Sequence, residues 1–326
     1  MTTGASASGP AVLAVEATRD GFVEARHRAH VALATAEGEL VGGAGDPAVW
    51  CYPRSAVKPL QAAACVEVVG QWLSGPSLAI ACASHEASID HQVEVAQVLA
   101  LGGLDEDALG CPPAWPADMP AVREQERPLR LAHNCSGKHA AMAWAQTVAT
   151  GRPDGYRDPD SPIQQRVTHV LAEACGVRPE GPGVDGCGAP AWRLPLDGLA
   201  RAMARLVAAP RGPLARVREA MGAYPLLVGG PQAPDSALML GDERVLAKRG
   251  AEGTLVAGVL APAGPVGIAV KVEDGAGRAA GPVAAAALAS VGARVPDGVR
   301  TPTVLGGGEP HGSLAPTDAL TAALGL

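Results

Sequence analysis

Short apolar stretches separated by glycine-containing breaks occupy the N-terminal part of the chain. The breaks are Asp20-Gly21 and Glu37-Gly38, and Asp-Gly between two extended stretches favours a tight hairpin turn. We therefore expect an antiparallel meander to open the fold, with strands at residues 12–19, 22–34 and 39–43.

Longer stretches that end at glycine follow and predict helices. Gly70 would end the first, and Gly176 would end the one that Ser161-Pro162 begins. Proline-rich segments at 111–120 and 152–162 are expected to be loops. The expected helices cover residues 55–70, 90–101, 138–150, 162–174, 196–208, 214–222 and 278–291.

The order of these elements sets the fold class. The continuous apolar run at 77–82 is strand-like, and two further strands are expected at 254–260 and 266–272. Terminal strands that pair with each other, with the helices inserted between them, give an α+β molecule of two lobes. The expected divisions are an N-terminal tail at 1–10, one main domain at 11–295 and a loop-like C-terminal tail at 296–326.

Composition narrows the class of protein. Of 326 residues 48% are hydrophobic but only 3% aromatic, with Phe22 the sole phenylalanine, so the core must consist of alanine, valine and leucine. A net charge of −7 and a pI near 5.6 argue against a nucleic-acid-binding surface and against a basic membrane patch. No apolar run reaches the ~18 residues of a membrane span.

The cysteines indicate the compartment. The N-terminus lacks a basic segment followed by an apolar one, so we expect no signal peptide. Seven cysteines, an odd number at scattered spacings, then favour reduced thiols in the cytoplasm. Most are expected to be small buried residues, with Cys135 and Cys187 as exceptions because of their neighbours.

A hydroxyl and an amine lie three residues apart in Arg54-Ser55-Ala56-Val57-Lys58-Pro59-Leu60-Gln61. If a helix begins near Ser55, the two side chains share one face, about 5–6 Å apart at Cβ. A neutral Lys58 could then accept the serine proton, as the same spacing allows in serine β-lactamases and penicillin-binding proteins. The alternative is a serine N-cap followed by a solvated lysine.

Lysine is scarce in this chain, and this favours Lys58 as a base over Lys58 as a solvated residue. The 26 Lys+Arg include only Lys58, Lys138, Lys248 and Lys271. Arginine is always protonated, whereas a buried lysine can lose its proton, so these lysines are expected to serve as amines. A biased nucleotide composition is the alternative explanation.

The densest group of functional side chains is His133-Asn134-Cys135-Ser136-Gly137-Lys138-His139. A cysteine at the head of a helix is favoured as the thiolate. Asp185-Gly186-Cys187-Gly188 supplies a second thiol, and two thiols with a nearby His or Lys nitrogen could hold zinc with one open position. Two unrelated buried cysteines are the alternative.

Three further positions are candidates. Ser84-His85 follows the strand-like run, where catalytic side chains commonly emerge. Lys248 precedes two glycines and could deliver an amine into a cleft. Lys271 ends an alternating strand, and could equally pair with Glu273 or Asp274 on the surface.

Taken in order, these motifs resemble those of the asparaginase II family, the Rhizobium-type L-asparaginases. The resemblance covers about residues 12–293 and implies hydrolysis of L-asparagine to L-aspartate and ammonia, on a fold similar to serine β-lactamases. It also implies a homodimer, and a zinc ion held by two cysteines and a lysine. The matching motifs are Arg54 to Gln61, Ala83-Ser84-His85, His133 to His139, Asp185-Gly186-Cys187-Gly188-Ala189-Pro190, Gly250-Ala251-Glu252-Gly253, and Lys271-Val272-Glu273-Asp274-Gly275 with Arg278-Ala279.

The resemblance also implies roles for single residues. Its catalytic Ser–Lys pairs fall on Ser55 with Lys58 and on Ser84 with Lys248, with Lys271 as the other candidate partner of Ser84. Its zinc ligands fall on Cys135, Lys138 and Cys187. The expected substrate-binding residues are Arg54, His85, Asn134, Asp185, Gly250 and Glu252.

The sequence departs from the family's motifs at two places, and three alternative functions stay open. Glu86-Ala87-Ser88 and Tyr224-Pro225 differ from the family's pattern and could alter the rim of the pocket. One rival is a β-lactam- or peptide-processing serine enzyme, although its Lys-Thr-Gly motif is absent. The others are a zinc amidohydrolase with structural Ser–Lys pairs, and a non-enzymatic amino-acid-binding or thiol redox protein that uses Cys135.

Overall fold

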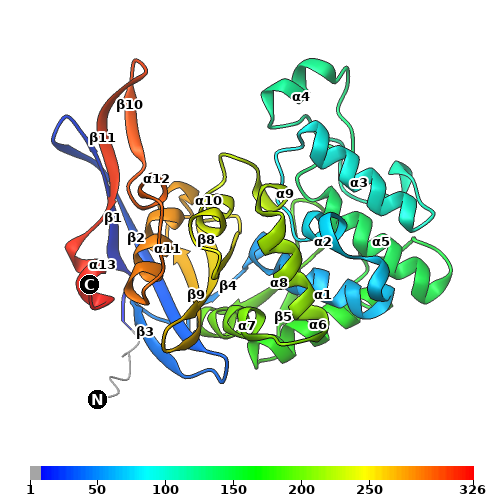
Figure 1. Ribbon diagram of the computed structural model, residues 1–326, viewed down its shortest axis with the longest axis horizontal. Helices are drawn as coiled ribbons and strands as arrows, with labels where there is room; N and C mark the ends of the chain where they lie inside the picture. Colours follow the sequence, from blue (N-terminus) through cyan, green and yellow to red (C-terminus); the bar gives the residue numbers. More distant parts are fainter. Residues whose placement is uncertain (1–8) are drawn as a thin grey trace.

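The computed structural model describes residues 9–326, so most of the expected tail at 1–10 lies outside the described residues. An eight-stranded antiparallel sheet forms the left half of the molecule in Figure 1. β3 (Leu40–Ala44) pairs with β2, off the main path of the sheet. The other strands, in spatial order, are β10 (Thr303–Gly306), β11 (Glu309–Pro316), β1 (Val12–Arg19), β2 (Phe22–Thr35), β9 (Gly264–Val272), β8 (Thr254–Ala261) and β7 (Val245–Arg249).

Strands from the two ends of the chain lie side by side in this sheet. β11 pairs with β1, with Val15 opposite Pro316, and β2 pairs with β9 along its second half. The α+β class and the pairing of terminal strands are therefore confirmed. The expectation of a loop-like segment from 296 onward is wrong, because that segment forms α12 (Asp297–Arg300), β10, β11 and α13 (Asp318–Ala323).

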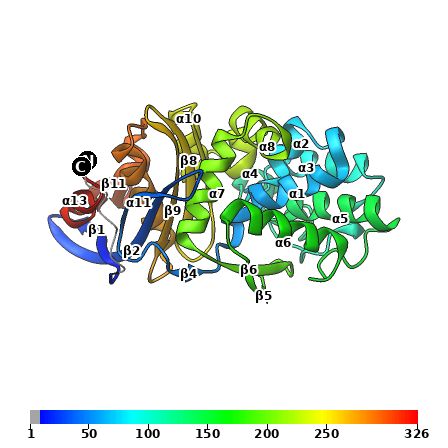
Figure 2. The same ribbon diagram turned by 90° about the horizontal axis from the view of Figure 1, so that it is seen from below.

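Helices cover both faces of the central strands. Residues 255–259 of β8 and 266–270 of β9 are buried without a break, as expected for strands packed on two sides. α7 (Leu196–Ala208) and α11 (Gly277–Ser290) both pack on β8 and β9, and Figure 2 shows them on opposite sides of the sheet. Gly267 of β9 lets α7 approach, because a Cβ there would overlap the carbonyl oxygen of Ala200.

The helical half lies between β3 and β7 in the sequence and on the right in Figures 1 and 2. α1 (Lys58–Val69) is at its centre and packs against α5, α6 and α8. The strand expected at 77–82 is wrong: residues 77–81 lie in α2 (Gly75–Ala81), whose first turn contains Pro76, and Cys82 is its C-cap. The other helices are α3 (Ile89–Leu101), α4 (Met119–Glu124), α5 (Ser136–Thr150), α6 (Pro162–Cys175), α8 (Gly212–Ala223), α9 (Pro225–Gly229) and α10 (Pro234–Gly241).

Smaller elements complete the fold. A three-stranded sheet consists of β4 (Trp50–Cys51), β6 (Pro190–Pro195) and β5 (Glu180–Val184). The 3-10 turns are η1 (Arg54–Val57), η2 (Gly70–Trp72) and η3 (Glu106–Ala108). Within residues 9–326, no helix has the length and apolar character needed to cross a membrane.

Candidate active site

The first predicted motif lies at the junction of the two halves. Ser55 is in η1, which contacts β7 and β8 of the sheet, and Lys58 begins α1 in the helical half. Gly250, just after β7, approaches the carbonyl oxygen of Pro53 so closely that a Cβ could not fit between them. The predicted residues Arg54, Ser55, Lys58 and Gly250 therefore share one region.

The amine of Lys58 is completely buried, and its hydrogen-bond partners come from two other motifs. Nζ donates to the carbonyl oxygens of Ala83 (2.5 Å) and Asn134 (3.4 Å), and lies 3.1 Å from Ser84 Oγ. Burial lowers the pKa of Lys58, against the opposing effect of Cys135. The expected pairing of Ser55 with Lys58 is not observed within the described residues, because the amine turns inward to Ser84.

Lys248 also differs from its expected place. It is fully buried, and Nζ donates to Asp235 Oδ2 and to the carbonyl oxygen of Arg249, each at 3.1 Å. Burial lowers the pKa of Lys248 to about 8, although Asp235 opposes the shift. The expected contact with Ser84 is not found in the described part of the chain, because a buried ammonium needs a counter-ion and Asp235 provides it.

Lys271 lies at the edge of the same region. Its Nζ donates to the carbonyl oxygens of Glu252 (2.7 Å) and Val272. Among residues 9–326, Lys58 is thus the lysine whose amine contacts Ser84 Oγ.

Unusual backbone conformations mark three of the motifs. Arg54, Ala87 and Glu252 have φ of 54°, 58° and 54°, in the left-handed region that residues with a side chain rarely occupy. Asp20 is the other such residue among those described, and it lies in the predicted hairpin turn. Such strain persists only where surrounding contacts impose it, and it gathers at functional sites.

Arg54, which precedes Ser55, belongs to a group of charged side chains. Arg54 Nε and Nη2 lie 2.8 and 2.6 Å from Asp185 Oδ1, and this hydrogen bonding raises the pKa of Arg54. The exposed Glu252 acts on the same guanidinium through its charge. Asn134 is an exposed residue, and its carbonyl oxygen accepts a hydrogen bond from the Lys58 amine. Both signs of charge are therefore available to a small zwitterionic ligand.

Two thiols and an amine converge at the head of α5. Cys135 precedes the first turn of α5, and Lys138 Nζ lies 3.2 Å from Cys187 Sγ. The neighbouring thiol of Cys187 lowers the pKa of Cys135 well below its ordinary value, and Cys135 in turn raises the pKa of Cys187, so the pair favours one thiolate. Burial would lower the pKa of Lys138, but Cys135 and Cys187 outweigh it and raise that pKa.

This donor set fits zinc, which binds sulfur and nitrogen. In the described chain, no group of three or more His, Cys, Asp and Glu side chains could hold a metal, so Lys138 would have to be the third protein ligand. The head of α5 is held tightly, since a Cβ on Gly137 would overlap the carbonyl oxygen of Ile80. The zinc site stays a prediction, with its three expected ligands brought together.

His85 is placed differently from the other expected substrate-binding residues. Its ring is buried and stacks on His91 at a centroid distance of 5.1 Å. Nδ1 accepts from the Ala87 N–H at 3.1 Å, and Nε2 lies 3.0 Å from Ser136 Oγ. Burial lowers the pKa of His85 well below its ordinary value. These contacts favour a structural role, linking the Ser84 segment to α5.

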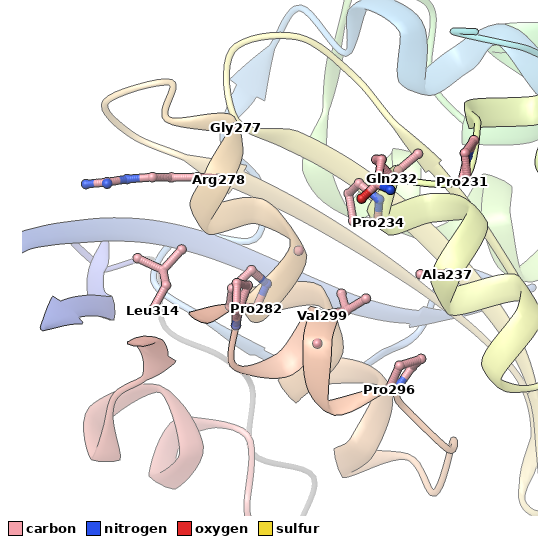
Figure 3. Close-up of a pocket in the computed structure, with 14 residues that line it drawn as sticks. Pro231, Gln232, Pro234, Ala237, Gly277, Arg278, Pro282, Pro296, Val299 and Leu314 are labelled. Carbon is pink, nitrogen blue, oxygen red and sulfur yellow. The ribbon is translucent and has the colours of Figure 1, made fainter. Parts of the chain in front are cut away.

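A separate cavity of about 460 Å³ lies between α10, α11 and α12 (Figure 3). Apolar residues such as Pro234, Pro282 and Val299 line it. The side chain of Arg278 extends away from them and donates to His27 Nε2 at 3.1 Å. None of the predicted catalytic or metal-binding residues is among the fourteen that line this cavity.

Sequence comparison gives one family match. The family described as L-asparaginase II matches residues 15–316, which is most of the chain. The chain belongs to the L-asparaginase II family. No curated protein sequence matches the chain.

Solved structures resemble this L-asparaginase II family member only distantly. The native form of Mglu is 18% identical, with a TM-score of 0.42, and the alignment covers 78% of this chain but only 61% of Mglu. A Bacillus subtilis glutaminase, solved as a covalent complex with 5-oxo-L-norleucine, is 12% identical with a TM-score of 0.40, covering 74% of this chain and 79% of the glutaminase. Likenesses at this level say nothing about the substrate of the L-asparaginase II chain.

Sequence reasoning missed two residues that contact this site. Asp235 is the counter-ion of Lys248, and Arg249 donates to the carbonyl oxygen of Ser84 at 2.9 Å. The one available signal was indirect: a lysine predicted to be buried needs a carboxylate, but no spacing in the sequence identifies which one.

Proposed function

We propose that this chain hydrolyses the side-chain amide of L-asparagine to L-aspartate and ammonia. The observation on which the proposal depends is the buried Lys58 amine, 3.1 Å from Ser84 Oγ and three residues from Ser55 in a strained turn. Family membership supports an amide as the substrate, and the charges of Arg54, Asp185 and Glu252 support a free amino acid.

The mechanism uses one lysine and two serines. Lys58, whose pKa is lowered by burial, would accept the proton of Ser55 once the substrate brings the two groups together, and Ser55 Oγ then attacks the amide carbon of the substrate. Ser84, hydrogen-bonded to the Lys58 amine, returns that proton to the departing nitrogen, so that ammonia leaves and an ester to Ser55 remains. Water then cleaves the ester and restores both groups.

Arg54, next to Ser55 in the sequence, and the charged residues near it in space would hold the rest of the substrate. Arg54 would bind the α-carboxylate, while Asp185 and Glu252 would bind the α-ammonium group. Cys135, Lys138 and Cys187 would hold zinc, which when bound supplies a fixed positive charge that orients polar groups nearby. Lys138 must be deprotonated to act as a ligand, so zinc affinity should rise with pH.

Ammonia release from L-asparagine and L-glutamine, with elemental analysis of the same preparation, tests this function. We expect asparagine to be the better substrate and Ser55→Ala to lower kcat by about 10³-fold or more. If Ser55→Ala stays active while Ser84→Ala does not, Ser84 is the nucleophile. Preference for glutamine, or release from neither amide, would overturn the proposed substrate.

Two further properties belong to the same proposal. The resemblance in sequence implies a homodimer, which analytical ultracentrifugation would test. All seven cysteines are free, and this supports a reducing compartment such as the cytoplasm.

A further inference from the structure

Arg249 connects three segments that meet at Ser84. One terminal nitrogen, Nη2, donates to the carbonyl oxygens of Ser84 (2.9 Å) and Gly229 (3.2 Å). The other, Nη1, donates to Asp235 Oδ1 at 3.1 Å. The guanidinium of Arg249 therefore joins β7 to the segment after α2, the end of α9 and the start of α10.

A fully buried carboxylate holds this guanidinium in place. Asp235 Oδ2 accepts from Lys248 Nζ and from the backbone N–H of Arg249, each at 3.1 Å. Burial would raise the pKa of Asp235, but Lys248 and Arg249 outweigh it and lower that pKa, so the carboxylate is ionised. A buried charge with several donors has little freedom to move, and Arg249 shares that rigidity.

Both main-chain polar groups of Ser84 are hydrogen-bonded, the N–H to α9 and the carbonyl oxygen to Arg249. The N–H of Ser84 donates to the carbonyl oxygen of Val228 at 2.9 Å, next to Gly229. Gly229 is tightly packed, because a Cβ there would lie 2.7 Å from Asp235 Oδ1. With the Ser84 backbone held in this way, its hydroxyl remains 3.1 Å from the Lys58 amine.

We propose that Arg249 is a positioning residue, which holds the main chain of Ser84 so that its hydroxyl faces Lys58. The kinetic consequences rest on the proposed function, whereas the effect on the Ser84 backbone does not. A planar guanidinium reaches two carbonyls and a carboxylate at once, and an ammonium at the same position could not reproduce that geometry.

The chain offers a matched control in Arg244. This arginine donates to both oxygens of the buried Asp242 (2.9 and 2.6 Å) and to the carbonyl oxygen of Gly292 (3.0 Å). Arg244→Ala therefore removes an ion pair with a buried aspartate and a bond to a carbonyl, as Arg249→Ala does, but at a place without contact to Ser84.

The test compares Arg249→Ala, Arg249→Lys and Arg244→Ala. A small misplacement of a reacting group can lower the rate by about 100-fold, so kcat should fall by about that factor in both Arg249 variants, with KM changed less than about threefold. Guanidinium chloride should restore part of the activity of Arg249→Ala. In a Ser84→Ala background Arg249→Ala should cause no further loss, because its effect acts through Ser84.

Hydrogen exchange of the peptide that contains Ser84 gives a readout that needs no activity. Exchange there should be at least about tenfold faster in Arg249→Ala than in Arg244→Ala. If the wild type releases no ammonia from any amide but this difference appears, the proposed function fails and the positioning role stands. Equal exchange in the two variants, or equal losses of kcat, would overturn the positioning role.

Discussion

Lys58 Nζ lies 3.1 Å from Ser84 Oγ, in a contact that brings together two motifs 26 positions apart in the sequence. Lys58 begins α1 and Ser84 follows α2, so the packing of the helical half determines their distance. The Lys58 amine also donates to the carbonyl oxygen of Asn134, next to Cys135. One buried amine therefore links the Ser-x-x-Lys motif, the second serine and the thiol cluster.

Replacing Lys58 should lower kcat strongly even when the new side chain carries a positive charge. Lys58→Met removes the base, and Lys58→Arg supplies a cation that cannot accept a proton, so we expect kcat to fall by about 10²- to 10⁴-fold in both. Lys58→Met also removes the donor to the carbonyl oxygen of the buried Ala83, and should lower the free energy of unfolding by about 1–3 kcal/mol. Ammonia release and urea unfolding measure the two effects. More than a tenth of wild-type kcat in Lys58→Arg would exclude Lys58 as the base.

Lys248 should matter for stability through its buried partner. Lys248→Met leaves the buried Asp235 with Arg249 as its remaining cation, and we expect the free energy of unfolding to fall by about 1–3 kcal/mol, the cost of a lost donor to a buried charge. In Lys248→Met with Asp235→Asn the loss should be smaller than the sum of the two single losses, since the buried carboxylate is gone. Urea unfolding of the two single variants and the double variant gives the coupling energy. Additive losses would contradict a buried ion pair.

The sequence predicted the fold where the signals were local. The strands around Asp20-Gly21 and the helices that end at Gly70 and Gly176 were found, because turn and cap residues mark their boundaries. The run at 77–82 was assigned to a strand because a short apolar run suits a buried strand and a buried helix equally. β11 was missed because its place depends on pairing with β1, far away in the sequence.

Sequence motifs identified which residues belong to the candidate site, but not which of their side chains contact each other. Motifs identified Ser55, Lys58 and Ser84 as site residues, but the i, i+3 argument did not predict the contact between the Lys58 amine and Ser84 Oγ. That argument treats a side chain as lying along its own helix, whereas the Lys58 amine turns to acceptors after α2 and before α5. Partners of buried charges are tertiary contacts, and no spacing in the sequence encodes them.

Zinc content should depend on three residues and not on buried cysteines in general. Cys135→Ala, Cys187→Ala and Lys138→Met should each lose most of the metal, because each removes a proposed ligand. Cys175→Ala is the control, since Cys175 is equally buried but lies at the end of α6. Elemental analysis after gel filtration gives the zinc per chain. Full zinc occupancy in Lys138→Met would remove the lysine from the ligand set.

Stability in acid should depend on Asp242. Its hydrogen bonds with Arg244 lower the pKa of this buried carboxyl below its ordinary value of 3.8. The folded chain therefore binds this proton less readily than the unfolded chain, and ionised Asp242 stabilises the fold. That contribution is complete above the unfolded value and is lost as the pH falls through 3.8 toward the folded pKa.

Asp242→Asn should accordingly lose stability at neutral pH and converge with the wild type in acid. At pH 7 we expect the free energy of unfolding to fall by about 1.5–3 kcal/mol, the worth of hydrogen bonds to a charged group. Between pH 5 and pH 2 the difference should shrink, because the carboxyl of the unfolded wild type takes up a proton while that of the folded chain is still ionised. Urea unfolding at several pH values measures it, with the exposed Asp107→Asn as the control. A difference that stayed constant down to pH 2 would show that Asp242 acts through packing and not through its charge.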